Sequence, residues 1–196
     1  MRPVSDTRSR LDCMRRTLPT ILAASIMLTA CTPAEPEATP ETTTEAAPEV
    51  ITDGLPIDAM PAVERTAQTA CPYLGTDWVA DTNGQRVTGY GTDERFSTPS
   101  CVFYSYPEEP QLTVIVRDMA TTDDAIAVVD WAAPIDSTEP AEEPAGWSGG
   151  RRGGNDTSGA LYAVQNGPTA VIVFTNQDQS LKAQLIAEEV IQNLGL

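Results

Sequence analysis

The chain has 196 residues, with 12 basic and 28 acidic side chains and no histidine, so its formal net charge is −16. Such an acidic chain lacks the basic footprint that nucleic-acid binding requires. The absence of histidine excludes a Ser-His-Asp triad, a Cys-His pair and the common histidine zinc sites. We therefore expect no nucleic-acid partner, no metal and no cofactor.

Residues 1–30 have the pattern of a cleaved signal peptide. Five arginines precede an apolar stretch of 13 residues, Leu18 to Ala30, which is shorter than the roughly 20 residues of a transmembrane helix. Leu28 to Cys31 match the lipobox of a bacterial lipoprotein. We expect cleavage before Cys31 and lipid attachment to its thiol, which would anchor the protein at the extracytoplasmic face of the cell membrane. An ordinary secretory signal with a chance cysteine is the alternative, and the export route (general or twin-arginine) stays open.

Residues 31–54 are dominated by Pro, Thr and Glu. Such a stretch buries too little apolar surface to offset its ordering entropy, so we expect a disordered tether. Without the signal, the chain keeps seven basic and 26 acidic side chains, a formal net charge of −19. The remaining residues, 55–196, are enough for a single globular domain with one core.

Cys71 and Cys101 are expected to form a disulfide. Cys13 leaves with the signal and Cys31 carries the lipid, so this pair is left in an oxidising location. Closing a loop of about 30 residues would contribute roughly 3.5 kcal/mol in the chain-entropy treatment. A dithiol redox site is the alternative, but it would favour C-x-x-C spacing.

The first half of the domain is expected to hold one helix followed by four strands. Asp58 can cap the helix, and Asn83-Gly84 favours a hairpin turn between the first two strands. The expected elements are a helix at 59–70 and strands at 78–81, 85–90, 101–106 and 112–119.

The second half begins with a helix at 122–133, which Thr121 or Thr122 can cap and Pro134 ends. A long irregular loop is expected at 135–158. A hairpin at 160–165 and 169–175 and a last helix at 179–194 follow, with Gly195 as a C-cap signal. The residues expected on the buried helix faces are Ile126, Val129 and Ala133 in the first of these helices, and Leu181, Leu185, Val190 and Leu194 in the second.

This element order, α-β-β-β-β-α-β-β-α, contains hairpins and no β-α-β alternation. It predicts an α+β domain in which helices pack on an antiparallel sheet of about six strands. The disulfide would tie the end of the first helix to the third strand.

The loop at 135–158 holds the most unusual side chains of the domain. Arg151 and Arg152 are the only adjacent basic residues after the signal, and glycines flank them on both sides. Backbone N–H groups in such a loop can form an anion-binding nest, and Trp147 could supply a stacking face. We therefore consider Trp147, Arg151 and Arg152 as ligand-binding residues. The alternative is that the arginines pair with Glu142 and Glu143.

No catalytic or metal-binding residues are predicted. Asp81 to Gly84 superficially resemble a calcium loop, but the required ligand positions do not match. The acid pairs Asp123-Asp124 and Glu188-Glu189 have the spacing of solvated helix faces rather than of a catalytic pair.

Three short stretches, together with the lipobox, carry a resemblance. Cys71-Pro72-Tyr73, Trp131 to Pro134 and Gly146 to Gly150 resemble a family of actinobacterial, corynebacterial-type lipoproteins that is known as a domain of unknown function. The resemblance covers most of residues 55–196. It implies a cell-envelope lipoprotein and supplies no activity. In element order alone, the domain also resembles the Mog1/PsbP-type α/β/α sandwich of other actinobacterial lipoproteins.

Together, these features favour a non-enzymatic binding or assembly module of the cell envelope. Its ligand would be an envelope protein or a glycolipid, and such a module should have an apolar or aromatic cleft. The alternative is a carboxylate-dependent hydrolase or transferase, which would need two acids facing one pocket with one pKa raised. The oligomeric state is not predicted.

Overall fold

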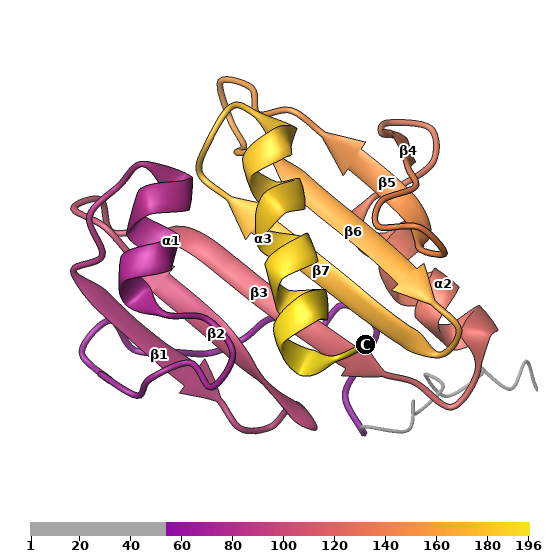
Figure 1. The fold of residues 1–196 in the computed structure, drawn as a ribbon, viewed down its shortest axis with the longest axis horizontal. Helices are drawn as coiled ribbons and strands as arrows, with labels where there is room; N and C mark the ends of the chain where they lie inside the picture. The colour runs from indigo at the N-terminus through magenta and orange to yellow at the C-terminus, as the bar shows by residue number, and fades with distance from the viewer. Residues whose placement is uncertain (1–53) are drawn as a thin grey trace, which may run out of the picture. The chain divides into compact units, whose positions relative to one another are not determined.

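The computed structural model describes residues 54–196, which fall within one compact unit. They form three helices and one seven-stranded antiparallel sheet, in the strand order β1-β2-β3-β7-β6-β5-β4 (Figure 1). This confirms the predicted α+β class, with seven strands in place of about six. The elements are α1 (Thr76–Asn83), β1 (Gly89–Asp93), β2 (Thr98–Tyr104), β3 (Pro110–Asp118), α2 (Thr122–Ala132), β4 (Glu139–Ala141), β5 (Ser148–Arg152), β6 (Leu161–Asn166), β7 (Thr169–Thr175) and α3 (Ser180–Leu194).

The helices cover both faces of the sheet. In Figure 1, α1 and α3 lie in front of the strands and α2 lies behind them. The core is accordingly divided in two by the sheet: Val114 and Val173 pack on the α1–α3 face, and Ile115 and Ile172 pack on the α2 face. β3 and β7 are buried on both faces, and each accordingly contains a run of consecutive apolar residues, 114–116 in β3 and 170–174 in β7, instead of an alternation.

The predicted helix at 59–70 is wrong, because this segment is not helical. Apart from isolated turns, such as that from Glu64 to Ala67, its backbone N–H groups bond to distant acceptors: Ala62 donates to the Asp93 carboxylate at 2.8 Å, and Gln68 to the Tyr90 carbonyl at 2.9 Å. The segment passes closely over β1. A Cβ atom at Gly91 would lie 2.5 Å from Cγ1 of Val63, so the missing side chain allows this approach.

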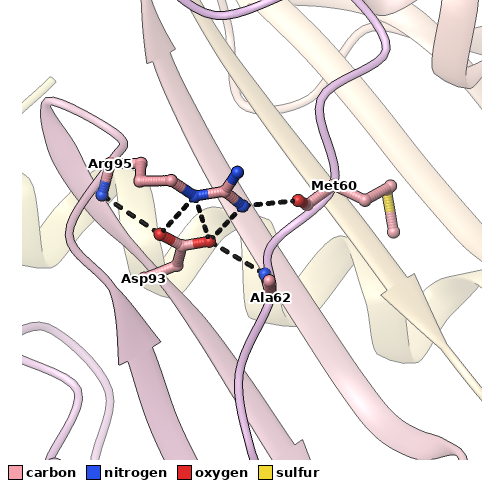
Figure 2. A network of polar contacts seen from close by, with 4 residues as sticks. All are labelled: Met60, Ala62, Asp93 and Arg95. Atoms are coloured by element: carbon pink, nitrogen blue, oxygen red, sulfur yellow. Dashed lines mark hydrogen bonds and ion pairs between the residues drawn. The ribbon is translucent and has the colours of Figure 1, made fainter.

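We call the contact between this segment and the end of β1 the Asp93 latch, formed by Met60, Ala62, Asp93 and Arg95. Figure 2 shows Asp93 between the Arg95 guanidinium and the backbone N–H of Ala62. Arg95 donates to both carboxylate oxygens of Asp93, the shorter contact being 2.6 Å, and to the Met60 carbonyl at 3.1 Å. The latch therefore joins the non-helical segment to the sheet by charge-assisted hydrogen bonds.

The disulfide prediction is confirmed. Cys71 and Cys101 are bonded, with their Cα atoms 5.6 Å apart. Cys101 belongs to β2, so the bond fixes the end of the N-terminal segment to the sheet rather than the end of a helix.

The predicted strands at 78–81 and 85–90 are also wrong in large part. Residues 76–83 form α1, and Gly84 ends it in the left-handed conformation, with φ 72°. The Asn-Gly pair is therefore a helix end and not a hairpin turn. Asn83 is fully buried: its Nδ2 donates to Oε1 of Gln111 at 3.0 Å, and its Oδ1 accepts from Oγ1 of Thr175 at 2.8 Å. These bonds connect α1 to β3 and β7.

The expected irregular loop at 135–158 contains two strands, β4 and β5, which extend the sheet beyond β6. Their sequences, Glu-Pro-Ala and Ser-Gly-Gly-Arg-Arg, have no apolar alternation. The strands form by backbone pairing, β5 with β6 and β4 with β5, which needs no particular side chains.

The remaining elements follow the prediction closely. Thr121 caps α2 by accepting from the N–H of Asp124 at 3.1 Å, β6 and β7 form the expected hairpin, and Gly195 ends α3 in the left-handed conformation. The buried faces differ, because Leu181 and Leu185 are exposed and so is Ile126. In α3 Val190 is buried as predicted, but otherwise a different set of residues faces the sheet. Its buried residues are Ala183, Ile186, Ala187, Val190 and Ile191.

Candidate functional site

A cavity of about 320 Å³ lies between α2 and the β4–β6 end of the sheet, and we call it the α2 groove. Its volume is at the small end of the range for small-molecule sites, about 300–1,000 Å³. It is lined by Ile126, Val129, Asp130, Ala133, Ile135, Thr138, Glu139, Pro140, Ser148, Gly149 and Gln165.

The spacing of residues along α2 explains one wall of the groove. Val129, Asp130 and Ala133 follow Ile126 by three, four and seven residues, so they share one helix face with it. Val129 and Ala133 are buried, whereas Ile126 is 38% exposed and points its apolar surface at the cavity. The opposite wall is open because Ser148 and Gly149 of β5 contribute little side-chain volume.

The entrance of the groove is also apolar. Ile135, which follows α2, is 81% exposed, an unusual position for a branched aliphatic side chain. Ile126 and Ile135 thus leave apolar surface in water on two sides of the same cavity. Exposed apolar surface that lines a concave site is typical of a binding site.

The polar groups of the groove are few. Gln165 donates from Nε2 to Oγ of Ser148 at 3.0 Å, while its Oε1 is buried without a hydrogen-bond partner among the described residues. Thr138 donates its hydroxyl proton to the Pro134 carbonyl at 2.8 Å. Asp130 is exposed at the rim and makes no hydrogen bond or ion pair with residues 54–196.

The two acids of the groove do not converge. Glu139 is paired in register with Arg151, and its Oε2 lies 3.7 Å from Nε of Arg151. Arg151 is in turn in register with Tyr162, which belongs to the α1–α3 core, so the Glu139 carboxylate is directed away from the α2 face. Asp130 is left as the only acid whose charge faces the groove. The geometry therefore offers no pair of carboxylates for acid–base chemistry.

The carboxyl group with a strongly shifted pKa lies elsewhere, in the Asp93 latch. Hydrogen bonds from Arg95, followed by those from the backbone N–H groups of Ala62 and Arg95, hold the pKa of Asp93 at about 2. A lowered pKa suits a structural ion pair, whereas a general acid needs a raised one. Within residues 54–196, no group of three or more His, Cys, Asp or Glu side chains is arranged to hold a metal ion.

The three ligand-binding residues predicted from the sequence are not brought together. Trp147 is 4% exposed and belongs to the α1–α3 core, so its ring is not free to stack on a ligand. Arg151 and Arg152 are adjacent in β5 and point to opposite faces of the sheet, where Arg152 donates to Oγ of Ser158 at 3.2 Å. Of the glycines beside them, Gly149 and Gly150 belong to β5, and Gly154 donates its backbone N–H to the Asp178 carbonyl at 2.9 Å, so no anion nest is formed. A role for either arginine in ligand binding stays a prediction.

Of the other predicted site residues, some lie within the described residues 54–196 and some lie outside them. Cys71 and Cys101 form the predicted bond. Cys31, with the predicted signal peptide at 1–30 and all but the last residue of the tether at 31–54, lies outside the described residues. In the described part of the chain, no helix is long and apolar enough to cross a membrane.

A second cavity, of about 520 Å³, lies on the α2 side of the sheet near Met60 and Phe174, and it is more polar. Two of its hydroxyl groups are already engaged: the side chains of Thr157 and Ser158 both donate to Oδ1 of Asn155, at 2.9 and 3.2 Å. The α2 groove keeps more unused binding capacity, since its apolar surface is exposed and one of its polar atoms is unpaired.

Comparison with protein-family models gives a match. A family model described as "Domain of unknown function (DUF2020)" matches residues 55–196, the whole predicted domain. No curated protein matches the chain.

Proposed function

Because the chain belongs to the DUF2020 family, whose function is unknown, we propose a function from the α2 groove. The protein is an exported, lipid-anchored module of the cell envelope that binds an amphiphilic ligand in this groove and does not transform it. The observation that carries the proposal is the apolar cavity of about 320 Å³ with exposed isoleucines at its entrance.

The chemistry of the groove favours binding over catalysis. Its lining contains no cysteine, lysine or arginine, and the chain contains no histidine. Asp130 alone would have to supply the acid–base chemistry, since the Glu139 carboxylate is directed to Arg151. A carboxylate-dependent hydrolase or transferase would need a second acid facing the same cavity. The ligand would instead be held by apolar contact and by a few polar groups that orient it.

The proposed address rests on the sequence around Cys31 and on the disulfide. Leu28 to Cys31 match a lipobox, and the bonded pair Cys71–Cys101 suits an oxidising compartment. Replacing Cys31 by Ala should abolish metabolic labelling of the protein by a palmitate analogue. Persistent labelling of the variant would refute the anchor.

The binding function is tested by extracting the full-length protein from membranes in mild detergent and analysing the small molecules that copurify by mass spectrometry. The informative variant is Ile126→Gln, which places an amide in the groove. Its matched control is Leu185→Gln, since Leu185 is also a partly exposed aliphatic residue on a helix, but on the opposite face of the sheet.

We expect one amphiphilic species to copurify with the wild-type protein and with Leu185→Gln, and to be depleted by about tenfold with Ile126→Gln. The expected loss follows from removing the apolar contact that the Ile126 side chain would make with the bound ligand. Such a contact contributes about 1.5 kcal/mol, which corresponds to about tenfold in affinity. Equal amounts of the same species on the two variants would contradict binding in the groove.

A further inference from the structure

We infer that the ligand of the α2 groove is a single-chain amphiphile whose polar end is a protonated amine. This inference rests on the proposed binding function and specifies the chemistry of the ligand. It follows from the hydrogen-bonding capacity that the groove leaves unused, and from the sign of the charge at its rim.

The unused polar groups of the groove are mostly acceptors. Oε1 of Gln165 has no hydrogen-bond partner, and the Asp130 carboxylate has none among residues 54–196. Thr138 has already donated its proton to Pro134, so its oxygen can only accept. The side-chain donor that remains is the hydroxyl of Ser148, which accepts from Gln165 and keeps its own proton. A ligand that brings N–H donors fits this inventory.

The unpaired oxygen of Gln165 is the strongest single indication. A buried polar atom without a partner costs about 1–3 kcal/mol, so most such atoms in proteins are paired. The Gln165 amide lies on the α2 face, in register with Ser148, and lines the cavity. Only one end of the amide reaches Ser148. The other end can be satisfied by a donor that enters the groove.

The charge around the groove selects the sign of the polar group. Asp130 faces the cavity, and none of the lining residues is basic. In the strand pairing, Arg151 is on the opposite face of the sheet and is engaged by Glu139. Arg152 points to the α2 face, but it does not line the cavity and it donates to Oγ of Ser158. An anionic head group would therefore meet repulsion from Asp130 with no cation among the lining residues to offset it. An ammonium group would be attracted and could donate to both Asp130 and Gln165.

The apolar part of the ligand is set by the rest of the lining. Ile126, Val129, Ala133, Ile135 and Pro140 form a continuous aliphatic surface without an aromatic ring. A flexible aliphatic chain suits this surface better than a planar ring, which would have no ring to stack on. The volume of about 320 Å³ favours a short chain or the end of a longer one.

The inference is tested by calorimetric titration of the full mature chain with three probes that share one chain, namely octylamine, 1-octanol and octanoate, at pH 7. The protein carries Cys31→Ser so that no lipid occupies the groove. We expect octylamine to bind about tenfold more tightly than octanol, as for a charge-assisted hydrogen bond, and octanoate to bind the most weakly.

Matched variants separate specific recognition from general attraction to an acidic protein. Asp130→Asn should weaken the binding of octylamine by about tenfold and leave the affinity for octanol unchanged. Asp156→Asn removes the same charge from an exposed turn outside the groove, and it should leave both affinities unchanged.

Two sets of results would overturn the inference, and only the second would also refute the proposed binding function. Octanoate binding as tightly as octylamine, or equal effects of Asp130→Asn and Asp156→Asn, would refute the amine while leaving a site for aliphatic chains. Failure of all three probes to bind, or octanol binding that Ile126→Gln does not weaken, would refute the proposed function and this inference with it.

Discussion

The Asp93 latch makes a prediction whose size and pH dependence both follow from the structure. The Asp93 side chain is 5% exposed and accepts hydrogen bonds from Arg95 and from the backbone N–H of Ala62. These contacts lower its pKa from 3.8 to about 2. Each unit of pKa shift corresponds to about 1.4 kcal/mol, so the charged form contributes up to ~2.4 kcal/mol to folding. Because the Arg95 side chain is 54% exposed and screened by water, we expect about 1–2 kcal/mol.

The sign of the pH dependence is fixed by the direction of the shift. The folded-state pKa of Asp93 is below its unfolded value, so the contribution is complete at neutral pH and declines as the pH falls below about 4. It should be reduced to about half near pH 3 and be nearly absent at pH 2. Replacing Asp93 by Asn removes the charge and keeps the shape. The variant should therefore be less stable than the wild type at pH 7, by an amount that shrinks toward pH 3.

The measurement is urea unfolding of the disulfide-bonded wild-type and Asp93→Asn proteins at pH 7, 4 and 3. All other carboxyl groups are common to the two proteins, so the difference between their free energies of unfolding isolates Asp93. Asp156→Asn serves as the control for loss of one surface charge, and it should shift the free energy by less than about 0.5 kcal/mol. A difference between wild type and Asp93→Asn that stays constant from pH 7 to pH 3 would refute the linkage, and no difference at pH 7 would refute the latch.

Three further changes test other parts of the fold. Replacing Cys71 and Cys101 together by Ala should lower the free energy of unfolding by about 2–4 kcal/mol in denaturant titrations, and an unchanged midpoint would argue against the bond. Gly91→Val would place a Cβ atom only 2.5 Å from Cγ1 of Val63 and so push residues 54–70 away from β1. These residues should become more susceptible to limited proteolysis, and a digestion pattern like that of the wild type would contradict this packing. Asn83→Ala should cost about 1–3 kcal/mol, because the amide of the buried Gln111 and the hydroxyl of Thr175 lose a partner; calorimetric melting checks this, and a loss below about 0.5 kcal/mol would show that the bonds are replaced.

The parts of the fold that local sequence signals determine were predicted well. α2 begins where Thr121 caps it, and the hairpin of β6 and β7 turns at Asn166-Gly167, where Gly167 has a positive φ. The last helix ends at Gly195 as its C-cap signal indicates. In each case the residues that decide the structure are neighbours in the chain, so a single sequence contains the necessary information.

The predictions from the sequence are wrong where residues that are distant in the chain decide the structure. Residues 59–70 have a cap and an apolar helical face, but β1 offers hydrogen-bond acceptors and a glycine surface to them. Asn83-Gly84 fits a hairpin turn and a helix end equally well, and the buried partners of Asn83 favour the helix. β4 and β5 have no apolar pattern, because they become strands through backbone pairing alone, β5 with β6 and β4 with β5.

The candidate site shows the same division. The length and composition of the loop after α2 indicate a binding region, and this loop supplies Ile135 and Pro140 to the groove. Within the loop the sequence favours Trp147, Arg151 and Arg152 as binding residues, because aromatic and basic residues are the usual signals of binding. None of these three side chains lines the groove. The residues that line the cavity include Ile126, which the helical pattern placed in the core. Only the position of α2 relative to β5 distinguishes an isoleucine in a groove from one in a core.

The path of the N-terminal segment has a mechanical consequence. A pulling force on the proposed membrane tether would enter the domain at residue 54 and act first on the bonds from Arg117 to the carbonyls of Leu55 and Pro56, and then on the Asp93 latch. Residues 54–70 could be drawn off the sheet under load, lengthening the tether by at most ~60 Å. The covalent bond between Cys71 and Cys101 would stop the extension there and pass the force to β2, inside the sheet. The segment would then act as a short extensible section of chain that protects the α2 groove from deformation.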